Sequence, residues 1–130
     1  MIDNKVVLIT GAAGKLGQSL SRAILKEKCS VIMVDIDEKR LNQLVETLPS
    51  ERVLGYSCDA SNEKDLSSII NLAVKKFGKI DAAIHSSYPK SKSWGTSFED
   101  LKIESLSEDL TCHLGGALIF SQVILKFFLK

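Results

Sequence analysis

The chain has few of the residues that build disulfide scaffolds or metal centres. It contains 3 cysteines and 2 histidines among 130 residues, and Cys29, Cys58 and Cys112 lie too far apart for metal-ligand or redox spacing. We therefore expect no metal site, and thiols that stay reduced in a cytoplasmic protein. The 17 basic residues are balanced by 16 acidic ones, so no net field favours nucleic acid or an anionic membrane as a partner.

Long apolar runs are also scarce. The polar segment Met1 to Lys5 leads directly into an apolar run, so we expect no signal peptide. The most apolar stretch, Leu114 to Leu129, is interrupted by glycines and polar residues and falls short of the roughly 20 residues that a membrane helix needs. We therefore expect no membrane partner, and a buried or interface helix in this stretch.

Short apolar runs alternate with amphipathic segments, which is typical of successive βαβ units. We expect strands over 5–10, 30–35, 52–57 and 80–85, with helices between them over 15–27, 38–48 and 62–77. A weaker helix is expected near 98–103, and a long one from about Ser107 to Lys130. Right-handed crossovers then predict one α/β domain over 1–130, a doubly wound, Rossmann-like parallel sheet of about four strands in the order 3-2-1-4, with helices on both faces.

Local patterns predict how these helices begin and which face they bury. Asp37 and Ser61 are the expected N-caps of the second and third helices, and Gly78 suits the left-handed residue after the third. The apolar residues of the first helix follow a three-and-four spacing that predicts the buried face. Those residues are Leu16, Leu20, Ala23 and Ile24.

Three glycines follow the first expected strand. Gly11, Gly14 and Gly17 allow a tight turn, a close backbone approach to a diphosphate and close packing of the next helix on the strand. The free N–H groups at the start of that helix attract anionic charge. Lys15 has two interpretations, a cation that attracts phosphate or a solvated lysine at a helix start. A turn without a ligand is the alternative for the glycines.

An acidic residue at the end of the second expected strand favours the ligand. Asp35 follows Gly17 at nearly the separation of about 20 residues expected for a carboxylate that accepts hydrogen bonds from an adenosine ribose. A carboxylate in this position also repels a 2′-phosphate. The sequence therefore predicts a dinucleotide site that prefers NAD to NADP.

These segments resemble the N-terminal half of the short-chain dehydrogenase/reductase family. Thr10 to Gly17 is similar to the family's glycine motif, although Lys15 stands where the commonest branch has its middle glycine. Cys58 to Ala60 is similar to the segment whose aspartate contacts the adenine amino group, and His85 to Tyr88 replaces the usual Asn-Asn-Ala-Gly. The resulting candidate cofactor-binding residues are Gly11, Gly14, Lys15, Leu16, Gly17, Asp35, Ile36, Cys58, Asp59, Ala60, Ser86 and Ser87.

The resemblance also bears on catalysis. His113 stands where the family carries a catalytic Asn, which makes it a candidate for a proton relay, with a structural polar residue as the alternative. The family's catalytic Ser and Tyr-x-x-x-Lys pair lie on two further strand and helix units, which this chain lacks, so we expect it to be inactive alone. Tyr88 and Lys92 match the Tyr-x-x-x-Lys spacing, but Pro89 and the polar residues after it predict a loop rather than the helix that the pair needs.

Two functions therefore remain open. The first is the nicotinamide-binding portion of an oxidoreductase that acts on a hydroxyl or carbonyl group. Segments 86–89 and 113–116 resemble relatives in surface-sugar biosynthesis. The second is a noncatalytic nucleotide-binding or assembly module that is complete at 130 residues. Without the family's later strands, the strand over 80–85 and the last helix would lack their cover, so we expect a homodimer or higher oligomer through that edge or helix.

Overall fold

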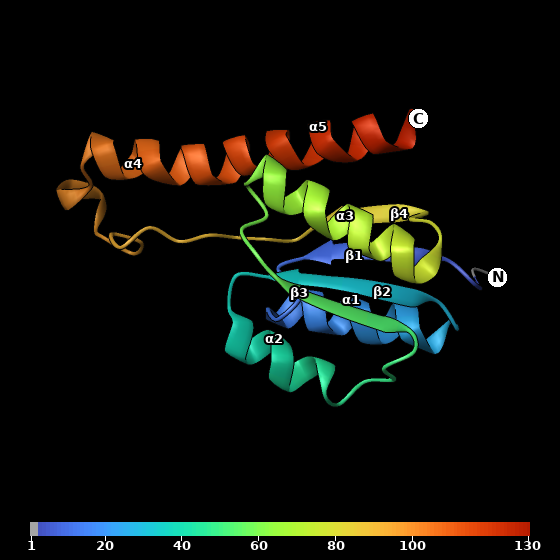
Figure 1. Cartoon of the computed structure of the whole chain (residues 1–130). Coiled ribbons are helices and arrows are strands. Elements are labelled where there is room, and N and C mark those ends of the chain that lie inside the picture. The colour runs from blue at the N-terminus through green and yellow to red at the C-terminus, as the bar shows by residue number, and fades with distance from the viewer. Residues whose placement is uncertain (1–2) are drawn as a thin grey trace.

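The computed structural model describes residues 3–130 and contains one sheet with helices on both sides (Figure 1). The elements in chain order are β1 (Val6–Thr10), α1 (Lys15–Lys26), β2 (Ser30–Asp35), α2 (Glu38–Val45), β3 (Val53–Ser57), α3 (Glu63–Phe77), β4 (Ala82–His85), the 3-10 turn η1 (Phe98–Asp100), α4 (Ile103–Leu110), the π-helical turn η2 (Thr111–Gly115) and α5 (Gly116–Phe128).

The four strands pair in the order β3-β2-β1-β4, and every pair is parallel. This confirms the predicted doubly wound topology. In the register, Thr10 of β1 lies beside Val34 of β2 and His85 of β4, while Asp35 lies beside Ser57 of β3. The carboxyl ends of all four strands therefore meet at one edge, where open α/β sheets bind their ligands.

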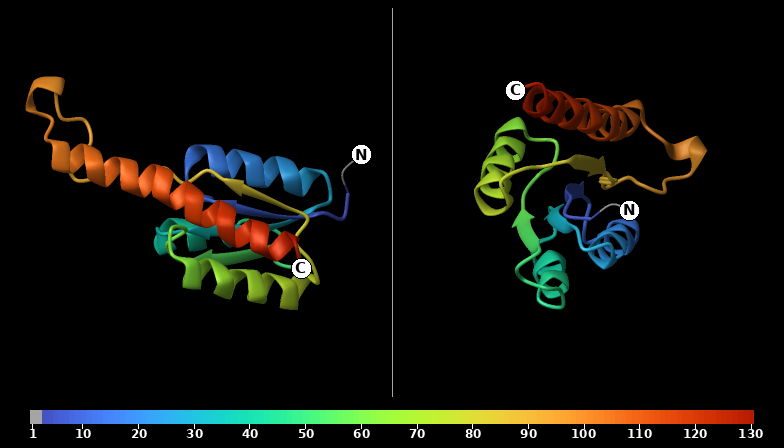
Figure 2. Two further views of the ribbon diagram at one scale, coloured as in Figure 1. Left: turned by 90° about the horizontal axis from the view of Figure 1, so that it is seen from above. Right: turned by 90° about the vertical axis from the view of Figure 1, so that its right-hand side faces the viewer.

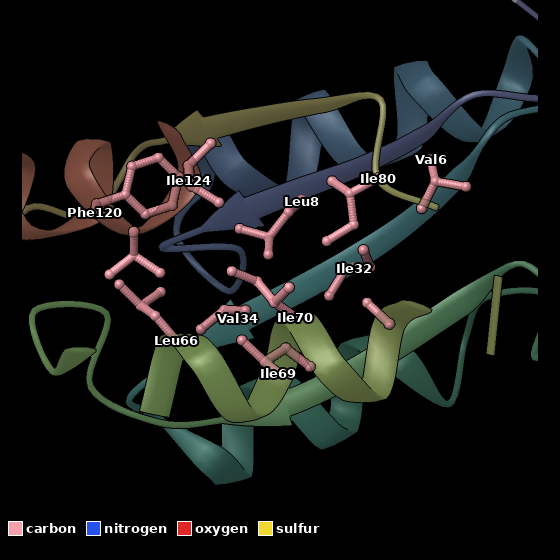
Figure 3. Packing of buried hydrophobic residues seen from close by; sticks show 12 residues of the cluster. Val6, Leu8, Ile32, Val34, Leu66, Ile69, Ile70, Ile80, Phe120 and Ile124 are labelled. Atoms are coloured by element: carbon pink, nitrogen blue, oxygen red, sulfur yellow. The ribbon is translucent and has the colours of Figure 1, made fainter. Parts of the chain in front are cut away.

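Alternate residues of the central strands enter two separate cores. Leu8, Ile32 and Val34 face α3 and α5 and pack against residues such as Ile69 (Figure 3). Val7, Ile9, Val31 and Met33 face α1 and α2 on the other side. Figure 2 shows these helices covering opposite faces of the sheet. Burial on both faces explains why β1 reads as a continuous apolar run rather than an alternating one.

Helix α1 buries only part of the expected face, since Leu20 and Ile24 pack against the core while Leu16 and Ala23 are exposed. Its buried residues are Gly17, Ser21 and Leu25, whereas Leu16 is 63% exposed. The buried Ser21 hydroxyl donates to the Gly17 carbonyl at 2.8 Å, so this polar side chain is satisfied inside the helix packing. The prediction gave weight to apolar side chains, but close contact with β1 requires small residues at this position.

The helix ends also depart in part from expectation. Asp37 caps α2 as predicted, accepting from Arg40 N–H, but α2 ends at Val45 rather than Leu48. The N-cap of α3 is Asn62 instead of Ser61, because the Asn62 side chain accepts from the N–H groups of the first turn. The segment near 98–103 forms only η1 rather than a helix.

The last three helical elements join into one run of 26 residues, Ile103–Phe128, which contains an 18-residue window with a mean hydropathy of 1.4. This run begins before Ser107 and continues through Gly115 and Gly116, so the helical segment is longer than the one expected. By length and composition alone the run could cross a membrane. Its α5 part packs against α3 and β4 through Phe120, which is the position of a helix in one layer of an α/β sandwich. Figures 1 and 2 show α4 extending beyond the sheet.

Candidate functional site

The turn between β1 and α1 has space for glycine only at two of its positions. Gly11 has a φ of +64°, and a Cβ atom there would lie 2.6 Å from the Ser86 carbonyl oxygen. A Cβ atom on Gly17 would lie 2.2 Å from the Gly11 carbonyl oxygen and 2.6 Å from Ala12 Cα. Both contacts are with backbone, which cannot move aside as a side chain can. The turn is thus drawn tightly onto the ends of β1 and β4.

The start of α1 leaves backbone donors at this turn. Gly14 is the N-cap and has no side chain to accept from the first N–H groups of the helix. Lys15 begins the helix and is exposed, as is Leu16. A helix N-terminus of this kind offers N–H groups and a positive dipole end to an anion. The predicted diphosphate position is therefore chemically suited to its ligand.

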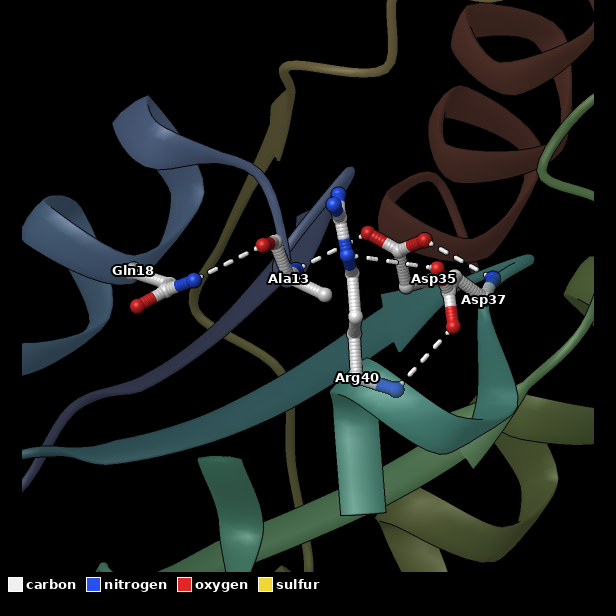
Figure 4. Close-up of polar contacts among 5 residues, drawn as sticks. All are labelled: Ala13, Gln18, Asp35, Asp37 and Arg40. Atoms are coloured by element: carbon white, nitrogen blue, oxygen red, sulfur yellow. Dashed lines mark hydrogen bonds and ion pairs between the residues drawn. The ribbon is translucent and has the colours of Figure 1, made fainter. Parts of the chain in front are cut away.

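Asp35 links β2 to the glycine turn (Figure 4). Ala13 N–H donates to Asp35 Oδ2 at 2.8 Å, and Asp37 N–H donates to Asp35 Oδ1 at 3.0 Å. Gln18 Nε2 donates to the Ala13 carbonyl at 2.8 Å and fixes the other side of the turn. Each carboxylate oxygen keeps a lone pair for a further donor, so Asp35 can still accept from a ribose hydroxyl.

A cavity of about 330 Å³ opens beside Asp35 at the carboxyl edge of the sheet. Six of the predicted cofactor-binding residues line it, namely Asp35, Ile36, Cys58, Asp59, Ala60 and Ser87. The prediction omitted six other lining residues, which are Ser61, His85, Tyr88, Pro89, Cys112 and Gly116. The two from the last helical run had no local sequence signal, since only the packing of α5 against α3 brings Gly116 near Ser61.

The polar groups of the cavity are fixed by local bonds. The Asp59 carboxylate accepts from Ser61 N–H at 2.8 Å and from the Ser61 hydroxyl at 2.6 Å. Burial, with the nearby carboxylates of Asp65 and Asp59, raises the pKa of the Cys58 thiol to about 11. Cys58 is therefore protonated at neutral pH and serves as a cavity wall rather than a nucleophile.

A second hollow, of about 460 Å³, lies on the other side of the glycine turn. Ala13, Gly14 and Lys15 line it together with Arg22 and Arg40. Of these cations only Arg40 has an ion pair among residues 3–130, and its partner is Asp37, at 3.5 Å. Positive charge therefore collects beside the turn, whereas carboxylates face the 330 Å³ cavity.

The end of β4 is bonded to the end of β1. Ser86 Oγ donates to the Thr10 carbonyl at 2.6 Å, and Thr10 Oγ1 and His85 Nδ1 lie 2.9 Å apart. The His85 ring also packs on Phe120, with 4.9 Å between the ring centroids. Ser86, predicted to bind cofactor, thus acts here on the sheet, while His85 lines the cavity.

Burial lowers the pKa of His85 below its ordinary value of 6.5. The unfolded chain consequently binds a proton more readily than the folded one, and the free energy of unfolding should fall as pH drops below about 6.5 towards the lower pKa of the folded state. Protonation of one group can lower the free energy of unfolding by at most about 1.4 kcal/mol per pH unit. The loss should be smaller here, because solvent screens the half-buried ring. Urea unfolding of the parent and of His85→Gln at pH 7.5 and 5.5 measures this loss, which should be smaller in the variant. Equal losses in the parent and the variant would show that His85 is not the group responsible.

His113 lies in η2 and faces an aromatic pair rather than the cavity. Its ring centroid is 4.2 Å from that of Tyr88 and 6.2 Å from that of Trp94, and its Nε2 is buried without a hydrogen-bond partner among residues 3–130. Tyr88 and Lys92 lie in an irregular loop, as predicted. Within residues 3–130, no group of three His, Cys, Asp or Glu side chains is placed to hold a metal ion.

Comparisons with known proteins agree with this geometry. The chain is 36% identical to the post-translational flagellin modification protein A of Campylobacter coli, over all of this chain and 52% of the relative. It is 26% identical to short-chain dehydrogenase reductase 3a of Arabidopsis thaliana, over 92% of this chain and 46% of the relative. The chain thus spans about half the length of the curated relatives it matches.

Solved structures give the same result for the fold. A short-chain dehydrogenase/reductase from Brucella melitensis superposes on 96% of this chain and 50% of its own, with a TM-score of 0.84 and 21% identity. A 3-ketoacyl-(acyl-carrier-protein) reductase from Brucella melitensis, solved as a complex with NADH, superposes on 92% of this chain and 48% of its own, with a TM-score of 0.79 and 22% identity. The family model described as short chain dehydrogenase matches residues 5–130, and the chain belongs to this family.

Proposed function

We propose that this chain is the NAD-binding half of a short-chain oxidoreductase that moves hydride between NAD and a hydroxyl or carbonyl carbon. The observation that carries this proposal is the bond from Ala13 N–H to Asp35 Oδ2. It holds a diphosphate-type turn and a ribose-type carboxylate side by side at the carboxyl edge of a parallel sheet. A turn that only reversed the chain would need neither the carboxylate nor the cavity beside it.

Different residues of the site would bind different parts of the dinucleotide. The Gly11 to Gly17 turn and the start of α1 would bind the diphosphate, and Asp35 would accept from the adenosine ribose. Asp59 and Ala60 line the cavity that would take the adenine. The nicotinamide ring, when bound, supplies the carbon that accepts or donates hydride.

The chain's charges bear on the choice between NAD and NADP in opposite directions. Asp35 would repel a 2′-phosphate, whereas Lys15, Arg22 and Arg40 line the neighbouring hollow and would attract one. Asp35 directly contacts the turn at 2.8 Å, while the cations reach it through flexible side chains. We therefore propose NAD as the preferred cofactor.

Titration with NADH tests the proposed function. Fluorescence of the reduced nicotinamide is followed as the protein is added, with the same titration in the presence of excess NAD as the competition control. Saturable binding that NAD displaces would support the site. A folded sample with no saturable binding of either dinucleotide would overturn the proposal.

The substrate class is a further part of the proposal. The similarity to a Campylobacter protein named for post-translational flagellin modification supports a reaction that serves a cell-surface structure. We propose a hydroxyl or carbonyl substrate of that process, with a surface-sugar precursor as the first class to assay. The assay requires a protein that supplies the remaining half of the family fold.

We also propose that copies of this chain associate through the outer face of the run Ile103–Phe128. Leu110, Leu114, Leu118 and Leu125 are all exposed along this run, at spacings of four or seven residues that place them on one side of a helix, and exposed apolar surface of this kind marks interaction sites. A second copy would bury the same stripe around a twofold axis. Sedimentation velocity should show dimer for the parent and monomer for Leu118→Lys. The matched control is Leu72→Lys on α3, also exposed, which should remain dimeric; a monomeric parent would contradict the proposal.

A further inference from the structure

His85 is the cavity residue whose role neither the glycine turn nor Asp35 explains. It ends β4, lies beside Thr10 in the sheet register and lines the 330 Å³ cavity with Asp35 and Asp59. Its ring is held on two sides, by Phe120 at 4.9 Å between centroids and by Thr10 Oγ1 at 2.9 Å from Nδ1. A ring held in this way has a fixed orientation, with Nε2 on the side of the ring away from Thr10.

The hydrogen bond to Thr10 determines which ring nitrogen carries the proton. The Thr10 side chain is fully buried, and His85 Nδ1 is the one hydrogen-bond partner of its hydroxyl among residues 3–130. If Nδ1 were protonated, it would donate to Oγ1, and the hydroxyl proton would be buried without an acceptor, which is unfavourable. Thr10 therefore donates to Nδ1, and the neutral imidazole carries its proton on Nε2.

A donor at this position complements the carboxylates of the cavity. Those on Asp35 and Asp59 only accept hydrogen bonds when ionised, and the Ser61 hydroxyl already donates to Asp59. A dinucleotide presents many acceptors, including phosphate oxygens, ribose oxygens and adenine nitrogens. The hydroxyl groups of Ser87 and Tyr88 also line the cavity, but His85 is the donor whose ring is fixed by both Thr10 and Phe120.

We propose that His85 is a cofactor-positioning residue, whose Nε2–H donates a hydrogen bond to an oxygen or nitrogen acceptor of the bound dinucleotide. This inference rests on the proposed dinucleotide site and adds to it a donor that Thr10 orients from behind. Thr10, at the end of β1, thus acts on the cofactor through His85 rather than by direct contact.

The tautomer is measured by NMR on protein labelled with ¹⁵N in its two histidines. His85→Gln assigns the His85 signals by their disappearance. We expect the free protein at pH 7.5 to show His85 protonated on Nε2, and Thr10→Val to give a mixture of the two tautomers. A proton on Nδ1 in the free parent protein would overturn the inference before any ligand is added.

The contact with the cofactor is tested by adding NADH to saturation. The Nε2–H signal of His85 should shift and exchange more slowly with water, and His85→Phe, which keeps a ring against Phe120, should bind NADH about tenfold more weakly. The double variant Thr10→Val/His85→Phe removes the orphan hydroxyl, so a matching loss there excludes a purely structural cause. Saturable NADH binding with an unmoved Nε2–H signal and undiminished affinity in His85→Phe would overturn this inference alone. Absence of NADH binding in the folded parent would overturn the proposed function with it.

Discussion

Replacing Gly17 with alanine is expected to lower the free energy of unfolding by about 3 kcal/mol and to weaken NADH binding by at least about tenfold. The added Cβ atom would lie 2.2 Å from the Gly11 carbonyl oxygen and 2.6 Å from Ala12 Cα. Because both neighbours are backbone atoms, α1 must move away from β1, and the N–H groups at its start move with it. The gain in helix propensity from glycine to alanine, about 1 kcal/mol, offsets only part of this cost.

Two other glycines provide the controls for this prediction. Gly78 ends α3 with a φ of +79°, and a Cβ atom there would have no other atom within 4 Å, so Gly78→Ala should cost about 1 kcal/mol of backbone strain and leave NADH affinity unchanged. Gly14→Ala places its Cβ atom 3.2 Å from the Gly11 carbonyl oxygen and should fall between the two in stability. Urea unfolding and NADH titration measure both quantities. If Gly17→Ala and Gly78→Ala changed the free energy of unfolding and the NADH affinity equally, α1 would not pack against β1 as described.

Asp35→Ala is expected to weaken NADH binding by about 10- to 150-fold. The carboxylate would accept from the ribose, and a hydrogen bond to a charged group contributes about 1.5–3 kcal/mol. The substitution also leaves Ala13 N–H without its acceptor, so the turn itself loses order. NADPH should lose far less affinity than NADH, because the repulsion of a 2′-phosphate disappears with the charge. Parallel titrations with the two reduced cofactors measure the change in preference.

The matched control for Asp35→Ala is Asp37→Ala. Asp37 lies two residues later and caps α2 by accepting from Arg40 N–H at 3.0 Å. Its removal should cost about 1 kcal/mol of stability and leave NADH affinity within about twofold. If Asp37→Ala weakened NADH binding as much as Asp35→Ala does, the lost affinity would come from disorder of the segment between β2 and α2 rather than from the ribose contact.

Much of the fold could be predicted because its causes are local. Continuous apolar runs marked the buried strands, and Asp37 and Gly78 marked helix ends through their own backbone preferences. The strand order followed from the glycine turn after β1 and from the handedness of crossovers. Asp35 could be placed near the turn because adjacent parallel strands end at the same edge of a sheet.

The errors arose where tertiary packing overrides local pattern. Leu16 fits a periodic stripe but is exposed, since Gly17 and Ser21 are the residues small enough to meet β1. Ser61 and Asn62 are both good caps, and the Ser61 hydroxyl is taken by Asp59. Cys112 and Gly116 reach the cavity only because the long helical run crosses over α3, which no short sequence window contains.

The same cavity has a thermodynamic consequence. Its walls come from the end of β2, the segment after β3, the end of β4 with the loop that follows it, and the last helical run, so they are assembled only in the native chain. A dinucleotide would bind native molecules and not unfolded ones. At a ligand concentration one hundred times the dissociation constant, it would raise the free energy of unfolding by about 2.7 kcal/mol. A higher cofactor concentration would in this way reduce the fraction of unfolded chains that proteases can cleave.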